Sequence, residues 1–390
     1  MAEWVERKIS DIGTVVGGAT PSTKKPENYE DGKIAWITPK DLSTFSGRYI
    51  ERGERNITEI GLKSCSTQLL PPNTVLFSSR APIGYVAITA NEVCTNQGFK
   101  SVIPNENTDP LFLFYLLKYN KDKIEGMGSG TTFKEVSGNT MKNIVVNVPT
   151  DKKVQEKIAA ILGSIDDKIE ENEQINNNLE QQAMALYENT FCTPSNIAMK
   201  HISLSDLMDY SGGSQPPASK FIFIKRDGYI RFVQIRDYDT DSHITYIPES
   251  AKNKLCEEHD IMIARYGASL GRICFGINGA YNVALAKVFP KKSYFREFLR
   301  CYLSSRTFYE GINNKGGRSA QAGFNQSDIN SFELDFPIDE AIVQKFENTV
   351  APMFEQRLQL RKENQRLASL RDTLLPKLMS GELDVSDIDL

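Results

Sequence analysis

The sequence predicts an α/β (α+β) fold with two similar globular domains, each followed by a long helix. Three observations predict it. Short motifs occur twice at a nearly constant spacing, each copy alternates β-rich runs with a helical run, and each copy ends in a long helical apolar pattern. The 390 residues leave room for about two domains. We expect domains over residues 1–150 and 194–338, and long helices over 151–193 and 339–390.

The duplication is visible along the whole chain. Residues 17–21, GGATP, recur as GGSQP at 212–216, and IAWI at 34–37 recurs as IRFV at 230–233. Matching glycine, asparagine and proline positions continue in the same order toward the end of each copy. The offset changes by only about ten residues, as small loop insertions would produce. Two copies of one fold are therefore predicted.

Each copy begins with short strands separated by Pro, Gly and Asn clusters. In the first copy we expect strands near Lys33–Thr38, Thr74–Ser78, Tyr85–Thr89 and Phe99–Ile103. A helix rich in Leu, Phe and Tyr is expected near Pro110–Lys121, and again near Tyr294–Tyr309. Each domain closes on a strand, Ile144–Val148 or Phe332–Phe336, which is followed by proline.

The long helices carry apolar residues at heptad spacing, which predicts that they pair with each other. Asparagine interrupts the seam once in each copy, and Pro352 predicts a kink or a late start of the second helix. Pro376 and Gly381 are expected to end it. The residues expected to pair the helices are Ile158, Ile165, Asn172, Leu179, Val350, Leu360, Asn364 and Leu367.

A pseudo-two-fold axis between the copies would make the two helices antiparallel. The domains would then lie at opposite ends of an antiparallel coiled coil, about 45 Å apart for about 30 residues at roughly 1.5 Å each. Two such modules would suit two half-sites that are somewhat more than one DNA turn apart, and the half-sites need not match in sequence.

Several other classes of function find no support in the sequence. No phosphate-binding loop of the GxxxxGK[ST] type occurs, the six cysteines form no Cys-x-x-Cys pair, and the three histidines have no ligand-like spacing. We therefore expect no catalytic residue, metal or cofactor in this chain, and reduced, mostly buried thiols. The paired carboxylates at 166–167 and 170–171 are interpreted as a solvated helix face. Without an apolar leader or spanning segment, a cytoplasmic location is expected.

The charge is unevenly distributed, which matters for the choice of ligand. The net charge of −4 divides into +1 for residues 1–150, −5 for 151–199, +3 for 200–338 and −3 for 339–390. An anionic ligand would therefore bind the two globular domains.

Cations, amides and glycine-rich loops in the globular domains are candidates for DNA contacts. Alternatives stay open for them: an ordinary charged sheet face, pairing of the arginines with neighbouring acids, or plain connecting loops. The candidates are Lys24, Lys40, Arg48, Arg80, Thr131, Thr132 and Lys134 in the first copy, and Arg226, Arg231, Gln234, Arg236, Arg265, Arg318 and Gln321 in the second.

Two helical segments resemble a known family. Residues 367–383, LASLRDTLLPKLMSGEL, look like the C-terminal signature of specificity subunits of Type I restriction–modification enzymes. Residues 154–162, VQEKIAAIL, and 165–169, IDDKI, resemble the family's central conserved region. WITPKDL at 36–42 and GTTF at 130–133 are typical of its target-recognition domains. The resemblance covers nearly the whole chain.

The resemblance implies a DNA-recognition subunit without catalytic activity. It implies two target-recognition domains that each bind half of a bipartite, asymmetric double-stranded DNA site, with a helical spacer between them. It also implies two modification subunits, which bind S-adenosylmethionine and methylate adenine, and restriction/translocase subunits that use ATP and Mg²⁺. A coiled-coil scaffold with protein-binding modules only is the alternative function, and a nuclease with an unrecognised site is a further one.

Overall fold

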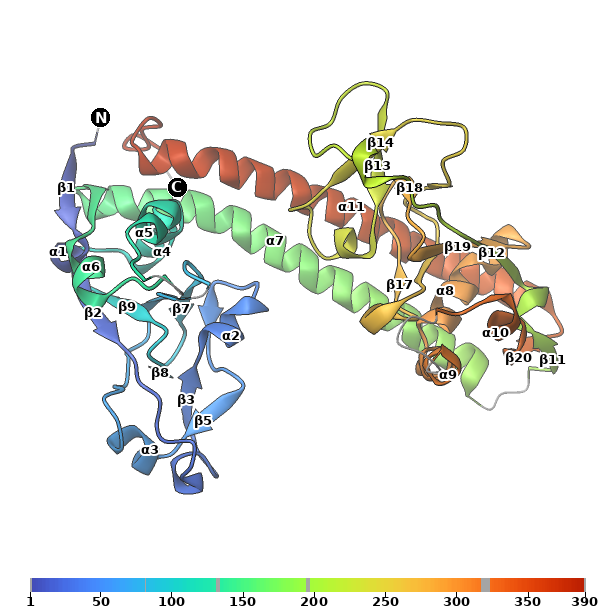
Figure 1. Ribbon diagram of the computed structural model, residues 1–390, viewed down its shortest axis with the longest axis horizontal. Coiled ribbons are helices and arrows are strands. Elements are labelled where there is room, and N and C mark those ends of the chain that lie inside the picture. Colours follow the sequence, from blue (N-terminus) through green and yellow to red (C-terminus); the bar gives the residue numbers. More distant parts are fainter. Residues whose placement is uncertain (1, 81, 131–133, 194–196, 317–322, 389–390) are drawn as a thin grey trace. The chain divides into compact units, whose positions relative to one another are not determined.

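The computed structural model describes residues 2–80, 82–130, 134–193, 197–316 and 323–388, and the chain forms two compact units (Figure 1). Unit 1 comprises Met1–Glu171 and Glu363–Leu390, and unit 2 comprises Asn172–Lys362. The long helices α7 (Lys152–Tyr187) and α11 (Glu340–Met379) each contribute one part to each unit. Each unit therefore contains one β-rich domain and parts of both helices.

The β-rich domain of unit 1 has three small sheets. Their strand orders are β2-β9-β6-β7-β4, β5-β3-β8 and β1-β10. The strands are β1 (Trp4–Lys8), β2 (Gly13–Gly17), β3 (Ile34–Ile37), β4 (Tyr49–Ile50), β5 (Arg55–Ile57), β6 (Val75–Phe77), β7 (Val86–Thr89), β8 (Cys94–Thr95), β9 (Lys100–Pro104) and β10 (Val145–Pro149). The helices are α1 (Ile9–Ile12), α2 (Pro39–Ser43), α3 (Glu59–Lys63), α4 (Pro110–Tyr119), α5 (Lys121–Gly126) and α6 (Gly138–Asn143).

Unit 2 repeats this plan with small differences. Its sheets have the orders β12-β19-β16-β17, β14-β13-β18-β15 and β11-β20. The strands are β11 (Met199–Ser203), β12 (Met208–Gly212), β13 (Tyr229–Val233), β14 (Thr245–Pro248), β15 (Leu255–Cys256), β16 (Met262–Ala264), β17 (Ile273–Cys274), β18 (Gly279–Tyr281), β19 (Leu285–Pro290) and β20 (Glu333–Pro337). The helices are α8 (Arg296–Ser304), α9 (Arg306–Gly316) and α10 (Gln326–Asn330).

The strand pairings confirm the duplication. β3 pairs in parallel with β8, Trp36 opposite Cys94, and β13 pairs in parallel with β18, Phe232 opposite Ala280. The antiparallel pairs β2–β9 and β12–β19 also correspond, as do β1–β10 and β11–β20. Parallel pairing of such short strands is an unusual feature to find twice, so the two domains share one topology rather than only one composition.

Most sequence-predicted elements lie within two residues of the observed ones, but the helix expected near Tyr294–Tyr309 is divided. It consists of a 3₁₀ turn at Ser293–Phe295 followed by α8 and α9. Ser305 separates the two helices because its backbone is extended (ψ 154°), and its hydroxyl accepts a hydrogen bond from the Phe308 N–H (3.3 Å). A serine that caps the following helix therefore ends the preceding one.

The second long helix differs in two respects from what its prolines predicted: it has no late start, and it does not end at Pro376. α11 begins at Glu340 and continues through both Pro352 and Pro376 to Met379. Pro352 is exposed, so the carbonyl of Asn348 that loses its donor faces the solvent side. The chain leaves the helix only before Gly381, whose φ of +76° favours glycine. Gly381 also packs against Trp4, and a Cβ there would lie 2.6 Å from Trp4 Nε1.

The two long helices run antiparallel in each unit. In unit 1, Asn364 Nδ2 on α11 donates to Ile169 O on α7 (3.2 Å). Seven residues further along α11, Arg371 pairs with Asp166, which lies three residues further back on α7. In unit 2, Arg357 pairs with Glu180 (2.7 Å). The apolar core of each unit includes residues from both helices, which confirms the predicted pairing inside each unit.

The residues predicted to pair the helices differ in burial. Ile158, Ile165, Asn172 and Val350 are buried, whereas Leu179, Leu360, Asn364 and Leu367 are half-buried. Wider side chains on the same faces, such as Tyr187 and Phe346 with ring centroids 6.3 Å apart, fill the interface in unit 2. The six cysteines are free and four of them are buried, as expected. No described helix is long and apolar enough to cross a membrane.

Candidate nucleic-acid interface

A surface pocket of about 510 Å³ in unit 1 brings together three of the predicted DNA contacts. Lys40, Arg80 and Lys134 come from three segments that are far apart in the sequence. The pocket is lined by Thr38, Pro39, Lys40, Arg80, Asn96, Gly98, Lys134 and Glu135. Three cations and one carboxylate around one concave surface favour an anionic ligand.

The first wall of this pocket is the start of α2. Asp41 Oδ2 accepts hydrogen bonds from the N–H and the hydroxyl of Thr38 (2.7 Å each), which closes the first turn of the helix. The other oxygen, Asp41 Oδ1, accepts from the Glu54 N–H (2.7 Å). Lys40 is exposed and pairs with Glu54 (2.7 Å), whose carboxylate raises the pKa of the lysine. The ammonium therefore stays charged and accessible to a ligand.

The second wall is a tight turn at Asn96 and Gly98. Asn96 Oδ1 accepts from the Gly98 N–H (2.8 Å), and the Asn96 N–H donates to Ile37 O in β3 (3.0 Å). A Cβ at Gly98 would lie 2.7 Å from Pro39 Cγ. The turn and the start of α2 therefore fit together only with glycine at this position.

The third wall carries Arg80 and Lys134. The backbone of Arg80 forms an isolated antiparallel β-bridge with that of Glu135. Beside it, the Val136 N–H donates to Ser79 O (2.8 Å). Glu135 also faces Lys100 at 3.4 Å. Lys134 is exposed and Arg80 is half-exposed, so both cations remain accessible.

Unit 2 builds the same backbone frame with different side chains. The Gln234 N–H donates to Asp237 (3.0 Å), the Asn282 N–H donates to Val233 O (3.0 Å) and Asn282 Oδ1 accepts from the Ala284 N–H (3.1 Å). Burial raises the pKa of the Asp237 carboxyl. Matching IAWI at 34–37 with IRFV at 230–233 places Gln234 at the position of Thr38 and Arg236 at that of Lys40. Arg265 takes the position of Ser79 rather than of Arg80, because its N–H donates to Ala284 O (2.8 Å) as the Ser79 N–H donates to Gly98 O (2.7 Å). The frame is thus repeated, while the groups available to a ligand differ.

The remaining candidates of unit 2 have various environments. Arg226 is exposed and lies 5.6 Å from the Tyr229 ring centroid, and Arg236 is about half-exposed. Arg231 pairs with Asp241 (2.7 Å), and Gln234 Nε2 donates to Thr245 Oγ1 (3.3 Å). Arg265 lies over Tyr266 and Phe324, at 5.1 and 5.7 Å from their ring centroids.

Not every candidate lies near the pocket frame. Lys24 is exposed in the loop before Pro26 and is not one of the residues that line the pocket. Thr131, Thr132, Arg318 and Gln321 lie outside the described residues.

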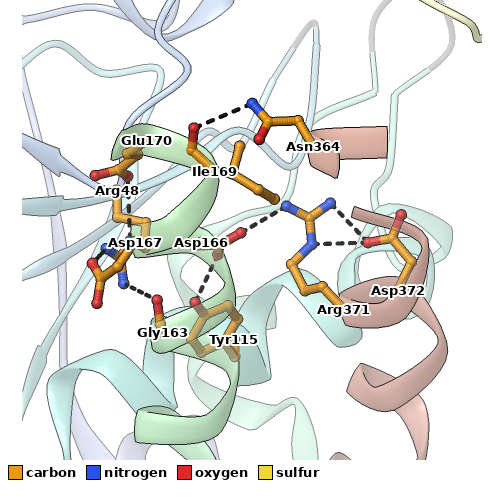
Figure 2. Close-up of polar contacts among 10 residues, drawn as sticks. All are labelled: Arg48, Tyr115, Gly163, Asp166, Asp167, Ile169, Glu170, Asn364, Arg371 and Asp372. Carbon is orange, nitrogen blue, oxygen red and sulfur yellow. Dashed lines mark hydrogen bonds and ion pairs between the residues drawn. The ribbon is translucent and has the colours of Figure 1, made fainter. Parts of the chain in front are cut away.

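Arg48 corrects one of the sequence predictions (Figure 2). Its side chain is only 7% exposed and lies against α7, where it pairs with Asp167, faces Glu170 at 3.4 Å and donates to Gly163 O (3.3 Å). These carboxylates outweigh the effect of burial and raise the pKa of Arg48. A guanidinium so enclosed attaches the β-rich domain to α7, and we no longer count it among the DNA contacts.

Asp166 corrects a second interpretation. The sequence suggested a solvated carboxylate, but Asp166 is buried, accepts from the Tyr115 hydroxyl (2.7 Å) and pairs with Arg371 (2.8 Å), as Figure 2 shows. Burial and the neighbouring Asp166 raise the pKa of Tyr115. The only sequence signal was an acid beside the heptad position of Ile165. In the described residues no group of three or more His, Cys, Asp or Glu side chains could hold a metal ion.

The fold, and the backbone hydrogen bonds that recur around the pocket in both units, define a class of protein that known families and relatives identify. The chain matches the family model of the Type I restriction modification DNA specificity domain over residues 1–181 and 196–358. The chain therefore belongs to this family of specificity subunits, with two DNA-recognition domains. The match by two successive segments agrees with the duplication.

Individual relatives agree with this assignment. The MjaIX specificity subunit of Methanocaldococcus jannaschii is 34% identical over 421 aligned positions, covering 99% of this chain and 95% of the relative. The HindI specificity subunit of Haemophilus influenzae is 24% identical over 474 positions, covering 98% and 100%. The solved structure of an S subunit from M. genitalium has the same fold, with a TM-score of 0.63 at 16% identity over 97% and 96% of the chains. The expectation of a specificity rather than a catalytic subunit is thus confirmed.

Proposed function

We propose that unit 1 and unit 2 each recognise one half of a bipartite, asymmetric double-stranded DNA site. The observation that supports this most is the repeated pocket frame with changed side chains: Thr38 and Lys40 in unit 1 against Gln234 and Arg236 in unit 2. Arginine and glutamine form bidentate hydrogen bonds with guanine and adenine edges. Lysine instead offers a compact ammonium charge and threonine a single hydroxyl. Two half-sites of different sequence are the expected consequence.

We further propose that α7 and α11 set the gap between the half-sites and provide the docking surface for two modification subunits. The supporting feature is that each helix is continuous, 36 and 40 residues long, and contributes to both units. Removing one heptad from each helix, centred on Asn172 and Asn364, should shorten the preferred gap by about one to four base pairs, at roughly 1.5 Å per residue and 3.4 Å per base pair. An unchanged gap would contradict this role.

Under this proposal the chain itself binds no cofactor. S-adenosylmethionine would be bound by the modification subunits, and ATP with Mg²⁺ by the restriction subunits. The cytoplasmic location likewise stays a prediction. The ligand assignments follow from the family resemblance. Binding of each ligand to the purified subunits, alone and assembled, tests them.

The experiment that tests the function is methylation mapping. Genomic DNA from cells that co-express this chain with its modification subunit would be sequenced by a long-read method that detects methyladenine. A two-part asymmetric motif with one methylated adenine in each half is the expected result. A stable complex of the two proteins that creates no new motif would instead favour the scaffold alternative, in which the modules bind proteins only.

A further inference from the structure

An exposed apolar loop tip in unit 2 takes no part in the base contacts proposed above. Phe223 and Ile224 are 71% and 81% exposed, the highest values for large apolar side chains in the described part of the chain. Leaving two such side chains in water forgoes the free energy that burying them would contribute. Isolated exposed apolar residues are common, but two adjacent ones at the end of a loop are typical of a contact surface.

The tip is held firmly at its base. The Ile222 N–H donates to Tyr246 O (3.0 Å) and the Tyr246 N–H donates to Ile222 O (2.8 Å), which joins the loop to β14. On the other side the Glu249 N–H donates to Gly228 O (2.8 Å). Phe221, two residues before the tip, packs on the core residue Phe232 with ring centroids 5.3 Å apart. The apolar tip is therefore a projection with a fixed base.

The surroundings of the tip favour a polyanion as partner. Lys220, Lys225 and Arg226 are exposed beside it, against the single carboxylate of Asp227. The loop leads directly into β13, which carries Arg231 and ends just before Gln234. The apolar tip, its flanking cations and the candidate base contacts thus follow one another along one segment of unit 2.

Unit 1 has nothing similar at the matching positions. Counting back from the matched Ile34 and Ile230, Glu27 and Asn28 take the places of Phe223 and Ile224. Asn28 is buried, its side chain donates to Ser22 O (2.9 Å) and its carbonyl accepts from the Thr58 N–H (2.9 Å). The first copy folds this segment onto its own domain, so the projecting tip belongs to unit 2 alone.

We propose that Phe223 and Ile224 form an apolar wedge that enters between two base pairs of the DNA held by unit 2 and kinks it. Phe and Ile side chains inserted between base steps unstack them, and flanking cations hold the phosphates on either side. This inference rests on the proposed DNA recognition by unit 2. It adds a deformation of the DNA that only one half-site undergoes, so the sequence preference there would include an easily unstacked step.

The test uses the assembled complex of this chain with its modification subunits and a DNA duplex that contains its mapped target. Dyes at the two ends of the duplex report bending by energy transfer. The double variant Phe223→Ser/Ile224→Ser should bend the DNA less and bind about tenfold more weakly, as the loss of about 1.4 kcal/mol would give. Ile60→Ser, at an exposed isoleucine of unit 1, is the matched control and should change neither value.

A second variant reports the insertion directly. Phe223→Trp places an indole at the tip, and stacking against bases should quench its fluorescence and protect it from iodide when the target DNA binds. The change is measured relative to the parent chain, whose two tryptophans, Trp4 and Trp36, lie in unit 1.

The outcomes separate the possible failures. Equal bending and affinity in the double variant, or a tip tryptophan that stays accessible to iodide, overturns the wedge. Loss of the modification subunits from the double variant also overturns it, because the tip would then bind protein. If the parent complex has no specific target at all, the proposed function itself has failed.

Discussion

The two junctions between a β-rich domain and the long helices use different chemistry at equivalent places. In unit 1 the helix α7 supplies carboxylates, and Arg48 and Arg371 pair with them. In unit 2 the position equivalent to Asp166 is Phe354, and Arg300 and Arg357 lie over its ring at 4.7 and 5.3 Å from the centroid. Unit 2 also has ion pairs at its long helices, such as Arg296 with Glu347 (3.5 Å) and Arg357 with Glu180 (2.7 Å). The two copies therefore differ at this one position, where unit 1 has a buried carboxylate and unit 2 has a ring under two arginines.

The arginine cluster of unit 2 lies around two aromatic rings. Arg300, Arg357 and Arg361 are 4.5, 5.2 and 4.7 Å from the centroid of Phe275. Burial lowers the pKa of both Arg357 and Arg361, yet guanidinium groups remain charged at neutral pH. The ring faces add to the carboxylates that already pair with Arg300 and Arg357, which are Glu297 (2.6 Å) and Glu180 (2.7 Å). The difference teaches that duplication preserves the backbone frame more strictly than the interactions that hold it.

The largest effect is expected from Arg300, which is almost fully buried. Its Nε donates to Glu297 (2.6 Å) and its Nη2 donates to His259 O (2.9 Å). Arg300→Met should lower the free energy of unfolding by about 3 kcal/mol, because it leaves a buried carboxylate and a carbonyl without these donors. Thermal unfolding followed by circular dichroism measures the loss, and hydrogen exchange should accelerate in α8 but not in unit 1.

The control for this change is Arg306→Met, which removes an exposed pair with Glu310 and should leave the stability nearly unchanged, because exposed ion pairs contribute little. The double variant Arg300→Met/Glu297→Gln should recover part of the loss, since it removes a buried charge that would keep only the half-exposed Arg296 (2.7 Å) as its ionic partner. Equal destabilisation by the two single changes would contradict the importance of the stacked cluster.

The ionic junction of unit 1 should be less sensitive. Asp166→Ala removes the acceptor of the buried Tyr115 hydroxyl and a partner of Arg371, and should cost about 2 kcal/mol. Asp166→Asn keeps an oxygen for Tyr115 and should cost about half as much. The exposed Glu171→Gln is the control. Thermal unfolding of the four chains checks this order, and an Asn variant as unstable as the Ala variant would show that the ion pair dominates.

A third prediction concerns DNA recognition and distinguishes the half-site bound by unit 1 from the half-site bound by unit 2. Arg236→Ala should change the preference only in the half-site bound by unit 2, with a loss of about 1–3 kcal/mol of discrimination, or roughly 5–160-fold. Lys40→Ala should affect only the other half-site. Methylation mapping of each variant complex measures the preference at every position. Equal loss at both half-sites would indicate a folding defect rather than a change in recognition.

Much of the fold follows from local sequence patterns, because short apolar runs, turn residues and heptads act locally. Lys40, Arg80 and Lys134 were predicted singly, and the structure brings them to one pocket. The roles of Arg48 and Asp166 were not predictable, because each depends on a partner more than a hundred residues away. An acid on a helix looks the same in the sequence whether it faces water or a buried tyrosine.

The smallest effect is expected at His201, an exposed histidine on β11. Its two ring nitrogens face Asp335 and Glu333 on β20 at 3.0 Å each, and these carboxylates raise the pKa of His201 above its usual 6.5. Because the pKa is higher in the folded state, the protonated histidine contributes its full stabilisation below pH 6.5. This stabilisation is lost as the pH rises through the pKa of the folded state. His201→Gln should therefore lower the melting temperature slightly at pH 5.5 and leave it unchanged at pH 8.5. A deficit that persists at pH 8.5 would mean that packing against β20, rather than charge, is what the histidine contributes.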